Sequence, residues 1–217
     1  MIDVLTEHWS EFSSGWWVTV QIIAGSFGIA MVVGTFVAAF RIAPNKWLQR
    51  LGGLYVEVFR NIPLLVLLFI SFAGLRRAGV DIGPWVAGIA SLGLYTAAYV
   101  AEALRSGVFS VGKGQIEASL SLGFSYAETL RRIVLPQAFR TVIAPLGSLT
   151  IAMIKNSAIV GVSLLALPDL LKQARVVSAR TFQTDETFFW AAVGYIILTG
   201  AATLIFRALE KRFAIAR

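Results

Sequence analysis

Two acid–base pairs lie beside strongly apolar stretches of the sequence, where charge is costly unless it is paired or hydrated. Glu57 precedes Arg60, and Glu102 precedes Arg105, in each case by three residues. Residues at this spacing share one face of a helix, so each pair can form an ion pair. The pattern fits a cytosolic gate or a relay between helices, and the alternative is that the ion pairs only anchor helix ends.

A lone lysine marks a third place where charge enters an apolar stretch. Lys155 is followed by Asn156 and Ser157, which add hydrogen-bonding groups. An ammonium group that faces a cavity could attract a substrate carboxylate, so we expect these three residues to approach a translocation pathway. The alternative is that Lys155 extends to the membrane surface or caps carbonyl groups where its helix ends.

The segment 107–113 spells GxxxxGK, the pattern of a phosphate-binding loop. Such a loop follows a buried strand and has Ser or Thr after the lysine. This one follows an apolar helical pattern and has Gly114 there, so we expect no nucleotide site on this chain. The sequence has no cysteine, and its one histidine, His8, lies in a polar N-terminal segment. We therefore also expect no catalytic residue and no metal site.

The composition of the chain indicates what kind of secondary structure must hold these residues. Hydrophobic residues make up 57% of the 217, charged residues only 14%, and the mean hydropathy is +0.75. These values exclude an ordinary soluble domain. About 20 apolar residues in a helix cross the ~30 Å core of a bilayer. Counting such windows predicts an all-α membrane protein with one domain, 1–217, and five transmembrane helices at approximately 16–40, 54–75, 82–104, 137–160 and 187–207.

Basic residues set the orientation, because those that flank a span are retained on the cytoplasmic side. With the N-terminus outside, the inner segments 41–53, 105–140 and 207–217 hold twelve Lys and Arg and the outer segments hold five. The prediction is N-out and C-in. The first ten residues lack a basic region, so the first span is expected to be retained. The net charge of +7 indicates orientation rather than nucleic-acid binding.

One polar segment, 114–136, interrupts the apolar chain on the predicted cytosolic side. Its apolar residues recur every three or four positions and form a stripe on one helical face: Ile116, Leu120, Phe124, Ala127, Leu130 and Val134. Gly123 predicts a bend or a close contact, and Pro136 predicts a helix boundary. By pattern alone the segment is either an interfacial helix on the membrane or a docking element for a partner.

The segment resembles the EAA loop of the membrane subunits of ABC importers. Glu117-Ala118-Ser119 stand at the EAA triplet, with Ser119 in place of the usual second alanine, Gly123 stands at the glycine, and Ile133-x-Leu135-Pro136 close the motif. The segments 55–64 and 101–107 are similar to the E-x-x-R-x-x-P and E-x-x-R-x-G elements of polar amino-acid permeases. Lys155-Asn156-Ser157 match that family's K-x-T/S-S element, although Ala158 replaces its last hydroxyl residue.

The resemblance implies a type I ABC importer permease fold in the bacterial inner membrane, with the EAA loop as a coupling helix. It implies ABC ATPase subunits that bind ATP and Mg, a second permease subunit that is either identical or paralogous, and an external amino-acid-binding protein. Glutamate or glutamine is the expected substrate, and this chain carries no cofactor. The residues expected to contact the ATPase are Glu117, Ala118, Ser119, Leu120, Gly123, Phe124, Ala127 and Leu130.

Two other classes of protein fit the sequence less well. A subunit of an ion-coupled secondary carrier or channel would have no reason to carry an EAA loop, and the chain has no convincing internal repeat of the kind that builds such carriers. A membrane enzyme is disfavoured because no His, Cys or carboxylate cluster supplies metal ligands or a nucleophile with its base.

Overall fold

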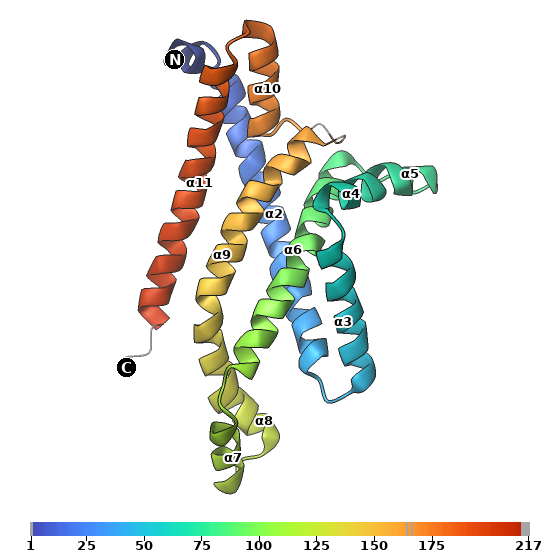
Figure 1. Cartoon of the computed structure of the whole chain (residues 1–217), viewed down its shortest axis with the longest axis vertical. Helices are drawn as coiled ribbons and strands as arrows, with labels where there is room; N and C mark the ends of the chain where they lie inside the picture. Colours follow the sequence, from blue (N-terminus) through green and yellow to red (C-terminus); the bar gives the residue numbers. More distant parts are fainter. Residues whose placement is uncertain (1, 164, 166, 214–217) are drawn as a thin grey trace.

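The computed structural model describes residues 2–163, 165 and 167–213, and its described elements are all helical, as predicted. Four long helices run along the bundle and include stretches apolar and long enough to cross a membrane: α2 (Trp9–Ile42), α6 (Pro84–Phe109), α9 (Leu135–Val162) and α11 (Thr184–Phe213). The predicted spans 16–40, 137–160 and 187–207 lie inside α2, α9 and α11, and 82–104 overlaps α6. The described chain begins at one end of the bundle and finishes toward the other (Figure 1).

The predicted span 54–75 is not one straight helix. α3 (Lys46–Asn61) stops before Pro63, and the following segment, made of α4 (Leu64–Phe69), a π-helical turn (Ile70–Gly74) and α5 (Leu75–Arg77), leaves it at 101°. Ile62 is extended, with ψ at 127°. Pro63 favours this conformation in the residue before it and has no amide hydrogen, so the helix cannot continue. α4 and α5 project sideways from the bundle (Figure 1), and the two arms form a fifth candidate span only when they are taken together.

α2 and α6 form the most extensive helix pair of the bundle. Small residues let their backbones approach closely. A Cβ added to Gly34 of α2 would lie 2.7 Å from the side chain of Val100. Further along, the hydroxyl of Ser26 donates a hydrogen bond to the backbone carbonyl of Ile89, at 3.1 Å. This close packing fixes two of the helices that carry the charged residues described below.

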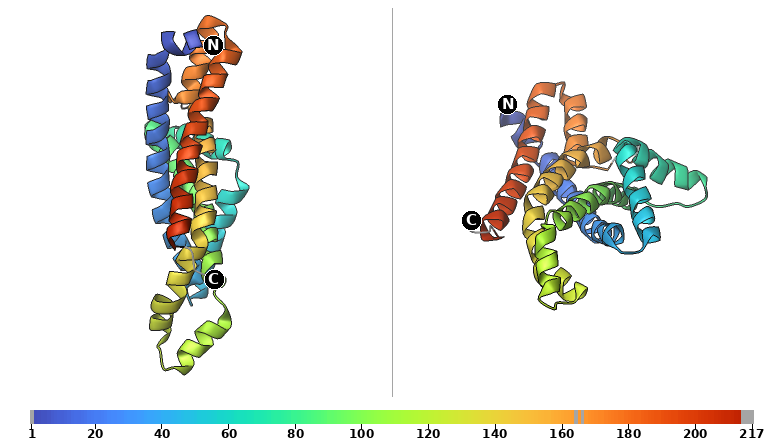
Figure 2. Two further views of the ribbon diagram at one scale, coloured as in Figure 1. Left: turned by 90° about the vertical axis from the view of Figure 1, so that its left-hand side faces the viewer. Right: turned by 60° about the horizontal axis from the view of Figure 1, so that its bottom comes forward.

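Short helices cap both ends of the bundle. At one end α1 (Ile2–Glu7) and α10 (Leu170–Thr181) pack beside α2 and α11, and at the other end α7 (Lys113–Ser121) and α8 (Tyr126–Thr129) extend beyond the long helices. Figure 2 shows that α7 and α8 stand clear of the rest of the molecule in two orientations. The polar segment of the sequence is therefore an appendage of the bundle, joined to α6 and α9.

The predicted boundary at Pro136 is wrong, because the chain remains helical there. A π-helical turn (Leu130–Val134) leads directly into α9, and the whole segment Tyr126–Val162 behaves as one helix of 37 residues. Pro136 lies in the first turn of α9. The wider π-turn before it accommodates the missing amide hydrogen and the bulk of the proline ring, so no break is needed.

Candidate functional site

The polar segment folds as two short helices at an angle, the bent pair that the glycine predicted. α7 is followed by a left-handed residue, Gly123 (φ +86°), whose amide donates to the carbonyl of Leu120, while the amide of Phe124 donates to that of Ser119. Such a termination favours glycine, because a Cβ is strained at positive φ. Ser125 then starts α8 with a capping box that it forms with Glu128.

A buried hydrogen bond ties the two short helices together. The hydroxyls of Ser119 and Thr129 lie 2.8 Å apart, and both side chains are almost completely buried. Ser119 was expected to contact the ATPase, but in the chain it faces α8. A small hydroxyl residue at this position therefore stabilises the angle of the pair, and alanine, which is usual in the family motif, would leave Thr129 without this partner.

The predicted apolar stripe divides at Gly123 because the left-handed turn changes the phase of the helix. Ile116, Leu130 and Val134 turn inward and line a hollow of about 440 Å³ against the ends of α2 and α6. Leu122 is instead 79% exposed, and Tyr126 is 62% exposed although it also lines this hollow. The predicted stripe, which assumed one helical face on both sides of Gly123, included neither residue.

The remaining expected coupling residues fall into two groups. Five of them are exposed on the helix pair: Glu117, Ala118, Leu120, Gly123 and Ala127. Phe124 and Leu130 are half-buried, and the guanidinium of Arg132 lies 5.8 Å from the centre of the Phe124 ring. The surface available to a partner is thus the five exposed residues together with Leu122 and Tyr126.

A second polar feature lies higher in the bundle, where α2, α3 and α6 meet. Glu102 forms ion pairs with both Arg41 of α2 and Arg105 of its own helix, the latter with Nε–Oε1 and Nη2–Oε1 distances of 3.1 and 2.5 Å. The pair Glu102–Arg105 is confirmed. Arg41 was not foreseen, since its partner lies 61 residues away in the sequence.

Glu57 and Arg60 do not form the ion pair that their spacing allowed, and that part of the prediction is wrong. Among the described residues neither has an ionic partner; the guanidinium of Arg60 lies 5.3 Å from the centre of the Tyr99 ring on α6. A cation over an aromatic face is an attractive alternative to an exposed carboxylate. Glu57, Arg60 and Tyr99 nevertheless line one hollow of about 450 Å³ together with Arg41 and Glu102.

That polar hollow adjoins another, of about 590 Å³, between α6 and α9. Arg60, Tyr99 and Glu102 line both, and the second hollow adds hydroxyl groups from Ser106, Ser110, Thr141 and Ser148. Polar and ionisable side chains in membrane helices face the bundle interior or a water-filled space. This side of α6 and α9 carries the ionisable groups Arg60 and Glu102, and we name it the polar face and its two hollows the polar hollows, of which the first is mainly polar and the second mainly apolar with a few hydroxyl groups.

Lys155, Asn156 and Ser157 do not share one surface, because consecutive helical residues point about 100° apart. Lys155 is exposed and, within the described residues, has no ion pair; Asn156 is half-buried. Ser157 is fully buried, and its hydroxyl donates to the carbonyl of Ile154 at 2.7 Å. Of the three, only Lys155 and Asn156 can face a pathway without movement of α9.

Asp169 is a buried carboxylate that sequence reasoning missed. It caps the N-terminus of α10, outside the four long helices: the amide of Lys172 donates to its Oδ1 at 2.8 Å and the hydroxyl of Tyr195 to its Oδ2 at 3.3 Å. Burial raises the pKa of Asp169 to about 6, although these hydrogen bonds oppose the shift. An aspartate directly before a helical segment that contains apolar residues predicts a helix cap, so this role could have been predicted from the sequence.

The GxxxxGK segment has no phosphate-loop geometry. It covers the last residues of α6, the turn at Ser110 and the first residue of α7, so a helix precedes it. A phosphate-binding loop follows a strand instead. Lys113 opens α7 and borders the hollow of about 440 Å³.

Comparison with known proteins agrees with these features. Residues 30–215 match the family described as binding-protein-dependent transport system inner membrane component. The chain is 41% identical over 215 residues to the probable glutamine ABC transporter permease protein GlnM of Bacillus subtilis, with 97% of each chain covered. It is 31% identical over 212 residues to the glutamate/aspartate import permease protein GltJ of Escherichia coli K12, covering 92% of this chain and 85% of that one.

Solved structures agree with the fold. A crystal structure of an amino acid ABC transporter with histidines contains a chain that is 32% identical, with a TM-score of 0.89 and 96% of both chains covered. An inward-facing MetNI methionine ABC transporter matches with a TM-score of 0.73 at 21% identity, covering 94% of this chain and 96% of that one, which supports the fold alone. The chain belongs to the family of inner membrane components of binding-protein-dependent transport systems.

Proposed function

We propose that this chain forms half of the transmembrane pathway of an importer in the bacterial cytoplasmic membrane, with glutamine or glutamate as the transported amino acid. The chain is a multi-pass, non-catalytic permease subunit of an ABC importer for polar amino acids, and ATP is hydrolysed by a separate ATPase. The observation that carries the proposal is the helix pair α7–α8, which stands clear of the bundle and presents exposed apolar side chains (Figures 1 and 2).

The helix pair is built to transmit movement. Its angle is fixed by the Ser119–Thr129 hydrogen bond and by the capping box at Ser125. Beyond it, the continuous helical segment Tyr126–Val162 runs from the pair to Lys155 without a break. Closure of the ATPase subunits would tilt this segment as a lever and so open or close the polar face, which is alternating access driven from outside the chain.

The polar face also supports a second permease subunit. Lys155 lies in a membrane-spanning helix yet is exposed in the single chain. A charge that faces lipid at that depth is costly. A second copy or a paralogue packed against this face would enclose Lys155 and the polar hollows, and the substrate would pass between the two chains. An external binding protein would deliver the amino acid on the N-terminal side, where α1 and α10 lie.

We expect Gly123→Asp to reduce co-purification of the ATPase by about tenfold or more, because it adds an uncompensated charge at the centre of the exposed docking surface. The measurement is the ratio of ATPase to permease in the complex purified through a tag on this chain. Retention of the ATPase at the wild-type ratio would contradict docking on α7–α8.

Gly79→Asp is a matched control for Gly123→Asp. Gly79 also has φ +86° and open space around its Cα, and its amide and the next one make the same two hydrogen bonds back to the preceding helix. The backbone strain and the added charge are therefore equal, while Gly79 lies between α5 and α6, away from α7–α8.

If this chain alone catalysed uptake in liposomes, the proposal would fail in favour of a secondary carrier.

We expect Lys155→Met to raise the KM for amino-acid uptake by about tenfold, since a charge-assisted hydrogen bond to a carboxylate is lost while the apolar stem of the side chain is largely kept. The measurement is uptake by the reconstituted importer, with Lys211→Met, near the end of α11, as the control. Unchanged affinity and coupling would show that Lys155 does not face the pathway.

A further inference from the structure

An apolar groove runs along the outside of the bundle to the base of the coupling helices. The hollow of about 440 Å³ beneath α7–α8 shares Ala39, Ile42 and Val108 with a second hollow of about 330 Å³. The second hollow continues along α2, α6 and α9 as far as Thr35 and Val142. Each hollow has a volume within the ~300–1,000 Å³ range of ligand sites in proteins. From Thr35 to Ile42 the groove follows about 10 Å of α2.

The lining of the groove carries a charged side chain only at the end beneath α7. The part beside α9 is lined by apolar residues and one threonine, with Leu104, Leu135 and Phe139 among its largest side chains. The only charged side chain among the residues lining the two hollows is Lys113, at the base of α7. No ion pair to Lys113 is formed within the described chain. The groove therefore matches a ligand with a long apolar part and an anionic end.

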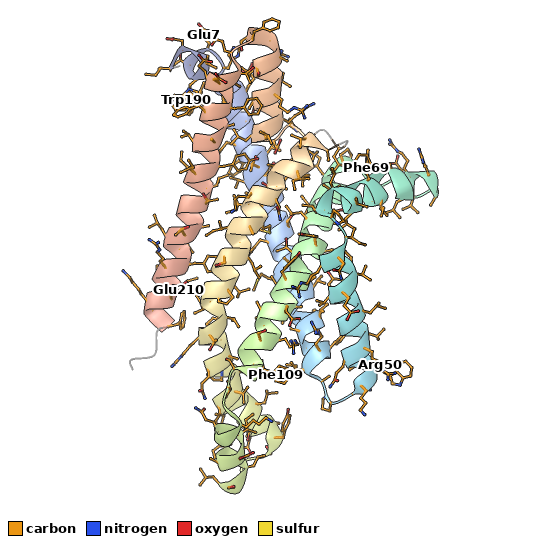
Figure 3. All side chains as sticks on the ribbon, viewed as in Figure 1. Glu7, Arg50, Phe69, Phe109, Trp190 and Glu210 are labelled. Atoms are coloured by element: carbon orange, nitrogen blue, oxygen red, sulfur yellow. The ribbon has the colours of Figure 1, made fainter. Side chains whose placement is uncertain are left out.

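Lys113 lies where the membrane surface should be. Ala43 and Pro44, which line the same hollow, are closely followed by Lys46 and Trp47, and Trp47 is 71% exposed. A tryptophan beside a basic residue at a helix end is typical of the membrane–water interface. Figure 3 shows Phe109 beside the coupling helices and Arg50 at the base of α3, toward the same end of the bundle.

The groove shares only one lining residue, Val142 of α9, with the polar hollows described above. The polar hollows open on the side of α6 that carries Tyr99, Glu102 and Ser106, whereas the groove lies on the side of Leu104 and Val108. A substrate pathway has no use for an apolar groove on the other side of α6. A membrane lipid, in contrast, can reach the part beside α9, where Leu135 and Phe139 are 44% and 54% exposed.

We propose that this groove, lined by α2, α6, α9 and α7–α8, binds one anionic phospholipid, with an acyl chain against Ala39, Ile42 and Val142 and its phosphate at the ammonium group of Lys113. Charge complementarity selects the anionic headgroup, because a basic residue near the cytoplasmic surface of the membrane attracts anionic lipids. The bound lipid would touch Ile116 and Leu130 on the inner side of the coupling helices, so it would support the helix pair from beneath. Lipid binding does not depend on the direction or the substrate of transport.

The test measures phosphatidylglycerol and phosphatidylcholine retained by the intact importer, purified with its ATPase from vesicles of both lipids and examined by native mass spectrometry. We expect preferential retention of phosphatidylglycerol, reduced about tenfold by Lys113→Glu, which reverses the charge at the headgroup. Ala39→Trp, which fills the middle of the groove, should reduce it similarly. One variant acts at the headgroup and the other on the acyl chain, so one can test the site if the other does not fold.

Two controls separate the groove from general effects. Lys46→Glu makes the same charge change at the same end of the bundle, and Ala24→Trp makes the same size change at an exposed position of α2; neither residue lines the groove. Both should retain phosphatidylglycerol as the wild type does. Equal retention of the two lipids by the wild type, or wild-type retention by both groove variants, overturns the proposal. Loss of a protein subunit from Ala39→Trp with phosphatidylglycerol unchanged also overturns it, since the groove would then be a protein interface.

Discussion

Replacing Gly161 by alanine is expected to lower the unfolding midpoint of the purified protein by roughly 6–12 °C, the shift that corresponds to about 3 kcal/mol in a chain of this size. A Cβ at this position would lie 1.7 Å from Oδ1 and 2.0 Å from Cγ of Asp169, distances at which one of the groups must move. Asp169 is completely buried and is held by the amide of Lys172 and the hydroxyl of Tyr195. Moving it breaks both hydrogen bonds inside the protein, where they cannot be replaced by water.

Removing the carboxylate should make the two substitutions non-additive. In the double variant Gly161→Ala with Asp169→Ala, the three Asp169 atoms nearest to the new methyl group are absent, so the clash is removed. The helix cap and the hydrogen bond from Tyr195 are already lost in Asp169→Ala alone, so the double variant should be about as stable as that single variant. Gly28→Ala is the matched control, because Gly28 also lies within a long helix but a Cβ there meets nothing within 4 Å. That variant should be neutral or slightly more stable. Gly161→Ala with the stability of Gly28→Ala would contradict the packing of α9 against α10.

The sequence was sufficient for the features that depend on local pattern. Apolar windows located the long helices, Gly123 located the bend of the coupling pair, and the spacing of Glu102 and Arg105 predicted an ion pair that the structure contains. Each of these follows from a rule that acts within a few residues of the chain. The predicted orientation rests on such a rule too and stays a prediction.

The failures came where a distant residue competes with a local pattern. Glu57 and Arg60 have the same spacing as Glu102 and Arg105, but Tyr99 on α6 offers Arg60 an aromatic face and the pair does not form. Spacing permits a contact without requiring it, since the free energy of an exposed pair is small. Asp169 was overlooked because its burial depends on contacts with α9 and α11, which no local sequence pattern shows.

The effect of proline was predicted wrongly twice. The helix before Pro63 was expected to continue but ends, and a helix was expected to end at Pro136 but the chain stays helical. Pro63 follows a helix that it cannot extend, because it lacks the amide hydrogen and restricts the residue before it. The segment therefore bends by 101°, although an apolar window counted straight across it. Pro136 falls in the first turn of α9, after a π-helical turn. A missing amide hydrogen is tolerated there. Pro145 lies inside α9 and does not end that helix either, so a proline in the sequence does not by itself locate a helix end.

Glu102→Gln is expected to lower the unfolding midpoint by roughly 2–8 °C, corresponding to about 1–2 kcal/mol, and to reduce amino-acid uptake by the reconstituted importer. The charge that pairs with Arg41 and Arg105 is lost, although the amide keeps the shape of the side chain. Its NH2 group would also face a guanidinium, donor to donor. The side chains of Arg41, Glu102 and Arg105 are 21%, 26% and 31% exposed. Solvent therefore screens part of the interaction, which keeps the expected loss modest.

Glu57→Gln separates the ion network from the charge of the polar hollows. Glu57 lines the same hollow as Glu102 but has no ionic partner among the described residues. The identical substitution should therefore change the free energy of unfolding by less than about 0.5 kcal/mol. Equal destabilisation by both substitutions would contradict a stabilising role for the Arg41–Glu102–Arg105 network. A stable but inactive Glu102→Gln would instead identify the network as a gate, because the link between α2 and α6 would then matter only while the helices move.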